Sequence, residues 1–383
     1  MTIVKNGMVY DAVHRDPYAA DLILENGKIA KIIRREEGKD TENANAENVI
    51  DAEGLRIYPG FVEAHGHTGL HSSGIGYEGQ DYNEMNDIIS PQLRGIDAFQ
   101  PLDDTVEAAR KAGVTTICVG PGSANVLGGT FTVVKTRGKR VDDMYIIKEA
   151  AMKCAFGENP KRCYRDKCDT SRMSTAAKLR EMLFKAKEYE AKIRAAGNDE
   201  SKLPPFDMKL QALLPVIRGE MPLKAHAHQA DDIFTAIRIA KEFGVKLTLE
   251  HVTEGHLIAD ELAKEGYPLA VGPTLMHPSK FETRHKSWTT PGILAAAGCK
   301  VSIITDAPVI PQQYLPLCAG LAVKAGMDPF AALQAITINP ARHIGAADRV
   351  GSIEEGKDAD LVITDGDPFE VGTNVKYVLI DGE

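Results

Sequence analysis

Short apolar runs alternate with longer segments of helical period through the middle of the chain. The apolar runs predict strands at residues 114–119, 223–227, 246–251, 269–271 and 300–305. Apolar positions recurring every three or four residues predict helices at 105–112, 175–195, 231–243, 257–264, 290–297 and 329–337. Repeated strand-then-helix units indicate a parallel sheet, and about eight units over roughly 290 residues fit a (β/α)8 barrel. A doubly wound sheet is the competing fold, but no phosphate-binding glycine fingerprint opens the first unit.

Both ends of the chain are rich in β-forming residues instead. Strands are predicted at residues 2–4, 21–24 and 29–33 near the N-terminus and at residues 359–365 and 375–380 near the C-terminus. The pairs Asn6-Gly7 and Asn26-Gly27 favour tight hairpins, because both residue types accept a positive φ. Residues 34–48 are charged and polar, which predicts an exposed loop. The ends therefore belong to a structure different from the middle.

Composition and charge narrow the range of partners. The chain of 383 residues has a net charge of −9, which argues against a general nucleic-acid or anionic-membrane binder, since both need a basic face. Its six cysteines are too sparse for a disulfide scaffold, and no second pair completes a metal site with Cys163 and Cys168. No apolar stretch approaches the ~18–20 residues of a membrane span, and residues 1–7 do not show the basic-then-apolar pattern of a signal segment. We therefore expect a soluble cytoplasmic protein that binds neither nucleic acid nor membrane.

Potential metal ligands gather where four predicted strands end. His65 and His67 follow the run at 61–64, and residues i and i+2 of a strand point to the same face. The other three ends carry His226 with His228, then His251, then Asp306. Barrel enzymes place their chemistry at the C-terminal ends of strands, and zinc prefers this mixture of imidazole nitrogens and a carboxylate oxygen. The coincidence of four such ends indicates a metal site.

The order of these residues resembles the amidohydrolase superfamily. Members of that superfamily present H-x-H on barrel strand 1, Lys or Glu on strand 4, His on strands 5 and 6, and Asp on strand 8. The phrase YPGFVEAHGH at residues 58–67 is similar to the strand-1 signature, as are residues 339–342 and 351–362 to its C-terminal phrases. The resemblance implies that residues 1–57 and 347–383 pair into a small β-sandwich beside a barrel of residues 58–346.

Within the superfamily, residues 226–229 resemble a phrase of the imidazolonepropionase-like and prolidase-like members. That match implies that His226 is the strand-5 ligand, and that His228 and Gln229 contact substrate; His228 as the ligand is the alternative. Residues 151–160 should contain strand 4. There Lys153 resembles the lysine that binuclear members carbamylate with CO2 to bridge two metals, and Glu158 is the alternative ligand.

Several loops could complete the site. His71 and Tyr77 follow strand 1 and are candidate substrate contacts. Residues 74–101 and 274–286 are expected to decide specificity, and the second of these could cover the site as a lid or be an exposed loop. The Gly-rich stretch before Lys135, a third cationic candidate, lacks the spacing of a phosphate loop and predicts a barrel loop over the site.

The expected chemistry is hydrolysis of a C–N bond in a small molecule, a cyclic or peptide-like amide, by a metal-activated water. Asp306 would accept the proton of that water and pass it to the leaving nitrogen, His251 would complete the metal site, and His228 would stabilise the oxyanion. One or two Zn²⁺ ions per chain are expected, with Mn²⁺ or Fe²⁺ as substitutes. The alternatives are a mononuclear deaminase of a heterocycle and an inactive barrel that acts as a binding protein. A homo-oligomer is expected from the general habit of such barrels.

Overall fold

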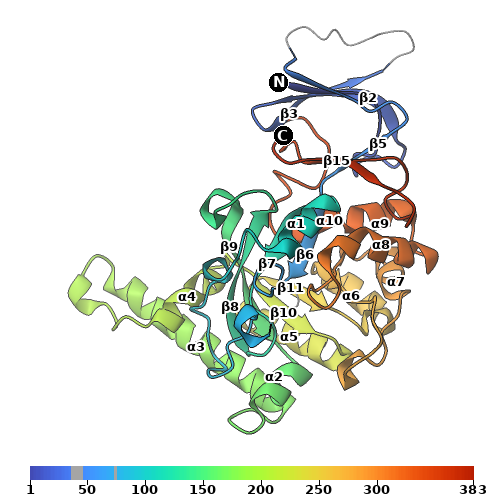
Figure 1. Cartoon of the computed structure of the whole chain (residues 1–383). Helices are drawn as coiled ribbons and strands as arrows, with labels where there is room; N and C mark the ends of the chain where they lie inside the picture. Colours follow the sequence, from blue (N-terminus) through green and yellow to red (C-terminus); the bar gives the residue numbers. More distant parts are fainter. Residues whose placement is uncertain (36–45, 73–75) are drawn as a thin grey trace.

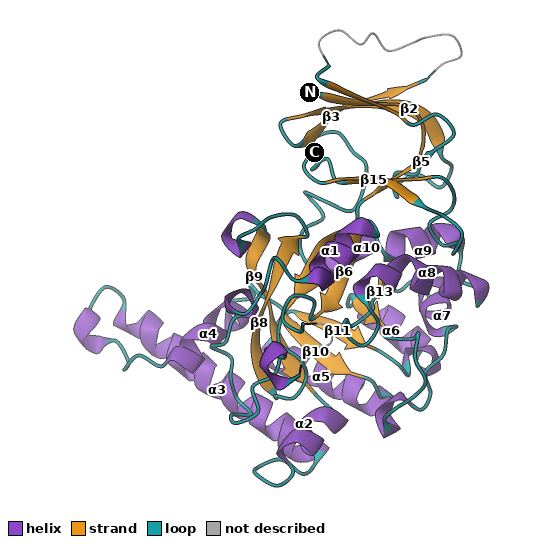
Figure 2. Cartoon of the chain, in the orientation of Figure 1, coloured by secondary structure: helices purple, strands orange, loops and turns teal. Residues whose placement is uncertain are grey.

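The chain forms two β-sheets in the computed structural model, which describes residues 1–35, 46–72 and 76–383. The larger sheet lies in the middle of the molecule and carries helices on its outside, and the smaller sheet, which contains both termini, sits at one end (Figures 1 and 2). Most of the predicted loop at 34–48 lies outside the described residues. No helix among the described residues is long and apolar enough to cross a bilayer.

The larger sheet is an eight-stranded barrel. Its strands in spatial order are β13 (Val301–Ile303), β12 (Leu269–Val271), β11 (Leu247–His251), β10 (Leu223–Ala227), β9 (Tyr145–Ala155), β8 (Leu127–Lys135), β7 (Val114–Val119) and β6 (Phe61–Gly66). The first and last strands meet through side chains: the Glu63 carboxylate accepts hydrogen bonds from the Thr305 backbone and hydroxyl, at 3.0 and 2.6 Å. The His67 N–H also donates to the Ala307 carbonyl at 2.7 Å. These contacts hold the ends of β6 and β13 side by side.

One strand departs from the predicted parallel arrangement. β8 runs antiparallel to both β7 and β9, whereas the other neighbouring strands are parallel. The reason is that short loops, and no α-helix, connect β7 to β8 and β8 to β9, so the chain reverses without a crossover. Gly128 and Gly129 of the Gly-rich stretch lie in β8 itself. The expectation that this whole stretch is a loop over the site is therefore wrong.

In the described part of the chain, six helices lie close to the predicted ranges, and four more, at residues 158–164, 208–217, 315–324 and 338–343, were not predicted; the helices lie outside the barrel strands (Figure 2). They are α1 (Asp104–Lys111), α2 (Glu158–Tyr164), α3 (Arg172–Ala196), α4 (Met208–Ile217), α5 (Ala230–Phe243), α6 (Ala259–Glu265), α7 (Thr290–Ala296), α8 (Leu315–Lys324), α9 (Pro329–Ala335) and α10 (Ile338–His343). Buried apolar side chains of α3 and α5, including Leu179, Leu183, Ile233 and Ile237, pack in one core with those of β10 and β11. This packing fixes the strand ends from which the candidate ligands project.

The smaller sheet combines the two ends of the chain, as the sequence predicts. Its order is β15 (Val375–Leu379), β14 (Leu361–Thr364), β5 (Arg56–Pro59), β1 (Thr2–Val9), β2 (Tyr18–Glu25) and β3 (Lys28–Arg34), with β4 (Asn48–Asp51) also paired to β1. Asn26 and Gly27 form the predicted hairpin, with φ of 50° and 76°. The predicted hairpin at Asn6-Gly7 is wrong, because these residues form an irregularity inside β1. The arrangement of this sheet as a sandwich stays a prediction.

Lys135 belongs to the junction between the two sheets. Its ammonium, at the end of β8, contacts the carboxylates of Asp358 at 2.8 Å and Asp360 at 3.0 Å, and also that of Asp381. The side chain is buried, so three acidic neighbours compensate the cost of burying its charge. Lys135 therefore ties the barrel to the C-terminal segment and does not reach the strand ends that carry the histidines.

Candidate metal centre

The strand ends that carry the candidate ligands have unusual backbone geometry. His251 ends β11 with a φ of 76°, and Asp306 follows β13 with a φ of 53°. Left-handed conformations are costly for residues other than glycine and persist where the surrounding structure enforces them, often at functional sites. At both positions the turn of the backbone brings a polar side chain to the C-terminal mouth of the barrel.

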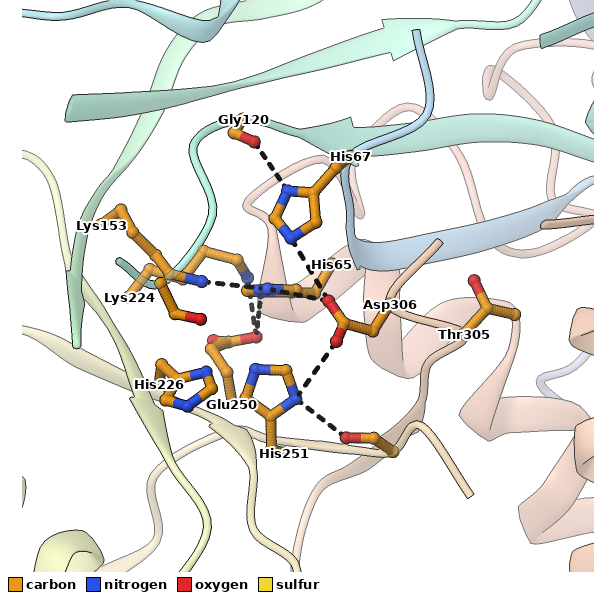
Figure 3. Close-up of polar contacts among 12 residues, drawn as sticks. His65, His67, Gly120, Lys153, Lys224, His226, Glu250, His251, Thr305 and Asp306 are labelled. Carbon is orange, nitrogen blue, oxygen red and sulfur yellow. Dashed lines mark hydrogen bonds and ion pairs between the residues drawn. The ribbon is translucent and has the colours of Figure 1, made fainter. Parts of the chain in front are cut away.

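Three of the predicted ligands form a first cluster (Figure 3). Its donor atoms, from His65, His67 and Asp306, all lie within 4.8 Å of one another. His67 Nε2 is 3.3 Å from Asp306 Oδ1, and His65 Nε2 is 3.8 Å from the same oxygen. Because His67 Nδ1 lies 2.8 Å from the carbonyl of Gly120, it carries a proton, which leaves Nε2 as the nitrogen that faces Asp306 and could bind a metal.

The acidity of Asp306 suits a ligand or proton acceptor. Burial raises the pKa of its carboxyl, but the hydrogen bond and charge of His67 and the charges of His65 and Lys153 outweigh burial, so the net pKa lies below its ordinary value. The carboxylate is therefore ionised at neutral pH. An ionised carboxylate can bind a metal or accept a proton, whereas a neutral one can do neither well.

The other three histidines form a second cluster. Donor atoms of His226, His228 and His251 lie within 4.8 Å of one another. His251 Nδ1 donates to the Gly272 carbonyl at 2.9 Å and His228 Nδ1 lies 2.7 Å from the Thr253 hydroxyl, so each directs Nε2 to the cluster. Within the described residues, both ring nitrogens of His226 and Nε2 of His251 are buried without a hydrogen-bond partner.

Unpaired buried nitrogens of this kind need an explanation. Burial, with nearby positive charge, holds the pKa values of His226 and His251 well below the ordinary value, and burial lowers that of His228 to about 3. All three rings are therefore neutral at neutral pH. Neutral imidazoles with free lone pairs fit a divalent metal, which supplies the missing partner.

Lys153 stands beside these clusters. β9 delivers its side chain into the barrel interior, where its Nζ lies 3.1 Å from His65 Nε2 and is fully buried (Figure 3). Burial lowers the pKa of the ammonium to about 8, although Asp306 and Glu250 oppose the shift. A larger fraction of the amine is therefore neutral and nucleophilic at neutral pH than for an exposed lysine.

A buried charge network lies beneath His65. The Glu250 carboxylate contacts Lys224 Nζ at 2.9 Å, His343 Nε2 at 2.9 Å and His65 Nδ1 at 3.1 Å. Burial raises the pKa of Glu250, but Lys224, His343 and His65 outweigh it and keep the pKa well below its ordinary value. The carboxylate orients the His65 ring, as partners of metal-bound histidines commonly do. The sequence alone indicated no such network, because Glu250 is a single acidic residue in an apolar strand and His343 lies near the chain end.

Removing the cation of this network should weaken the fold strongly. We expect Lys224→Met to lower the free energy of unfolding by about 3–5 kcal/mol, because it leaves a buried carboxylate without its cationic partner. Urea-induced unfolding followed by circular dichroism measures the effect. The control is Lys246→Met, an exposed residue directly before β11. This substitution should change the free energy of unfolding by less than about 0.5 kcal/mol. If both substitutions lowered the free energy of unfolding by the same small amount, the buried Lys224–Glu250 pair would contribute nothing to stability.

The remaining candidate residues lie further from the clusters. Glu158 begins α2, after β9 has ended, and its carboxylate accepts a hydrogen bond from the Glu282 backbone at 3.3 Å. Tyr77 is 84% exposed, and Gln229 accepts a hydrogen bond from Arg172 through its side-chain oxygen. His71 lines a cavity of about 250 Å³ next to the ends of β6 and β13.

Two neighbours of the clusters gave no signal in the sequence. Tyr82 stacks on the His67 ring, with ring centroids 5.1 Å apart. Glu282 is fully buried, and its Oε1 faces His226 and His228. It comes from the segment 274–286, which the sequence indicated only as a lid or an exposed loop.

Comparison with known proteins identifies the family of this chain. The profile of the amidohydrolase family matches residues 56–383, so the chain belongs to this family. Amidohydrolase tasK from Hapsidospora irregularis is 29% identical over 393 residues, which cover 95% of this chain but only 40% of tasK. An imidazolonepropionase from Thermoplasma volcanium is 26% identical over 389 residues, covering 95% of this chain and 89% of that protein. The crystal structure of an amidohydrolase from Thermotoga maritima MSB8 matches with a TM-score of 0.95 and 38% identity, covering 100% of this chain and 98% of the other.

Proposed function

We propose that this protein is a binuclear, zinc-dependent hydrolase that cleaves the C–N bond of a small cyclic or peptide-like amide. The observation that carries the proposal is the pair of donor clusters at the mouth of one barrel, His65–His67–Asp306 and His226–His228–His251, with the buried amine of Lys153 beside them. Imidazole-rich donor sets with carboxylate oxygens favour zinc. Two clusters favour a binuclear amidohydrolase over a mononuclear deaminase.

The roles of the residues follow from their positions. His65, His67 and Asp306 hold the first metal, and His226, His228 and His251 hold the second, so His228 serves as a ligand and not as a substrate contact. Lys153, carbamylated by CO2, supplies a bridging carboxylate; Glu158 is the less favoured alternative, because it lies on α2 outside both clusters. When bound, the metals polarise the scissile carbonyl and lower the pKa of water.

The chain's own groups then move the proton and place the substrate. Asp306 accepts the proton released from the attacking water and delivers it to the leaving nitrogen, as a positioned carboxylate can. His71 lines the cavity beside Asp306 and contacts the substrate there. We further propose that residues 1–57 and 347–383 form a separate small β-domain and residues 58–346 the catalytic barrel, so that the end sheet takes no part in the chemistry.

Metal content tests the proposal. Protein purified without chelators or a histidine tag should contain two equivalents of metal per chain by elemental analysis. A panel of cyclic amides, imidazolones, dipeptides and aminated heterocycles, followed by mass spectrometry, should then show metal-dependent hydrolysis of an amide. A chain that binds no metal after addition of zinc or manganese would refute the proposed function and leave a barrel that only binds ligands.

A further inference from the structure

The Glu282 side chain is buried, and its carboxylate is not fully paired with a cation. Its side chain is inaccessible to solvent, and its Oε1 has no hydrogen-bond partner among the described residues. Lys280 Nζ is 3.8 Å from this oxygen but donates its hydrogen bond to Asn159 Oδ1 at 2.8 Å. Burying a carboxylate oxygen without a hydrogen bond is costly, so the arrangement indicates a ligand that completes it.

The rest of the carboxylate is held in place. Glu282 Oε2 accepts a hydrogen bond from the Glu158 backbone at 2.8 Å, and the Glu282 backbone donates to the Glu158 carboxylate at 3.3 Å. The two residues thus exchange reciprocal hydrogen bonds between the start of α2 and the segment that follows β12. This exchange fixes the orientation of the carboxylate and leaves Oε1 directed toward the histidines.

The distances from Oε1 match those between ligands of one metal ion. Oε1 lies 3.5 Å from His226 Nε2 and 3.7 Å from His228 Nε2, too far for direct hydrogen bonds. Donor atoms bonded to a tetrahedral zinc ion at about 2.1 Å lie about 3.4 Å from one another. The spacing therefore fits a carboxylate and two imidazoles that share a cation, and His226 offers two nitrogens that have no other partner.

We propose that Glu282 is a ligand of the second metal, together with His226, His228 and His251. The inference rests on the proposed binuclear function and deepens it. With a bridging carbamate on Lys153, the second metal would have five protein donors and the first metal four, so the first metal has more room for the reacting water. The second metal therefore anchors the segment 274–286 over the barrel. This segment is part of the metal site instead of a free lid.

The test compares two substitutions in the full chain. Chelated wild type, Glu282→Gln and Glu261→Gln are titrated with Co²⁺ in the presence of bicarbonate and followed by visible absorption, with bound metal counted by elemental analysis. Glutamine at residue 282 keeps the acceptor for the Glu158 backbone but removes the charge. We expect Glu282→Gln to weaken Co²⁺ binding at the second cluster by more than about 100-fold, since changes to outer partners alone cost 10–100-fold. The control Glu261→Gln, at an exposed carboxylate on α6, should bind both equivalents as the wild type does.

A second measurement on the wild type removes any dependence on the folding of the variants. The Co²⁺ ion that fills the second cluster, but not the one that fills the first, should slow amide hydrogen exchange across residues 274–286. Unchanged exchange, or two tightly bound metals in Glu282→Gln, would overturn the role of Glu282 and leave the binuclear function intact. A wild type that binds no metal contradicts the proposed function itself, so the two failures are distinguishable.

Discussion

Asp306→Asn should lower turnover of the amide substrate by about 10²–10⁴-fold, the usual contribution of a positioned general acid or base. Asparagine keeps the shape of the side chain and one oxygen, but it can neither accept a proton nor carry the charge that His67 and Lys153 stabilise in the native carboxylate. The measurement is kcat under saturating substrate and metal. KM should change far less than kcat, because the lost interaction is made mainly in the transition state.

The control for this substitution must separate catalysis from metal loss. Asp306 also belongs to the first cluster, so metal content of the variant is measured in the same preparation. A matched acidic control is Asp367→Asn, which lies far along the chain near β14 and contacts the exposed Arg56. Near-normal turnover of Asp306→Asn with both metals in place would remove Asp306 from the role of proton acceptor.

The sequence identified the clustered histidines and Asp306 better than their surroundings. His65 and His67 could be identified because the two-residue period of a strand places them on one face, and Asp306 because it ends an apolar run. Glu282 could not, since its position depends on how the segment after β12 folds back toward α2. A single acidic residue in a loop carries no periodicity, and only the fold brings it to His226 and His228.

The fold, too, was predicted where local sequence decides it, and was missed where connections between distant segments decide it. β7 matches its predicted range, residues 114–119, because its run of mostly β-branched residues is bounded by glycines. The reversal of β8 was missed, because direction in a sheet is set by the connections on either side and not by the residues of the strand. Gly129 has a φ of 110°, and a Cβ at this position would lie 2.3 Å from the Leu93 carbonyl oxygen, so this glycine of the loop-like stretch allows close packing of the strand.

Burial inside the barrel also explains why Lys153 could react as a neutral amine and not act only as a cation. Its amine is next to His65, and the Lys153 and Lys224 ammonium groups both lie over the Phe131 ring, 5.3 and 5.4 Å from its centroid. Because burial lowers the pKa of Lys153 to about 8, roughly a tenth of the amine is neutral at pH 7, compared with well under 1% for an exposed lysine. The neutral amine could add to CO2, forming an N–C bond and releasing one proton, and the carbamate would supply the proposed bridging oxygens.

Lys153→Met should therefore reduce bound metal from two equivalents to one and turnover by at least about 100-fold. The first cluster loses its fourth donor, whereas the second keeps three imidazoles and Glu282. In the wild type, chelated and freed of CO2, uptake of the first-cluster metal should require bicarbonate. The protonated ammonium has no lone pair for CO2, so this uptake should increase as the pH rises from 7 through about 8 to 9. Full metal binding by the wild type without bicarbonate at every pH, together with two metals in Lys153→Met, would show that the amine takes no part in the site and would return the bridging role to a carboxylate such as Glu158.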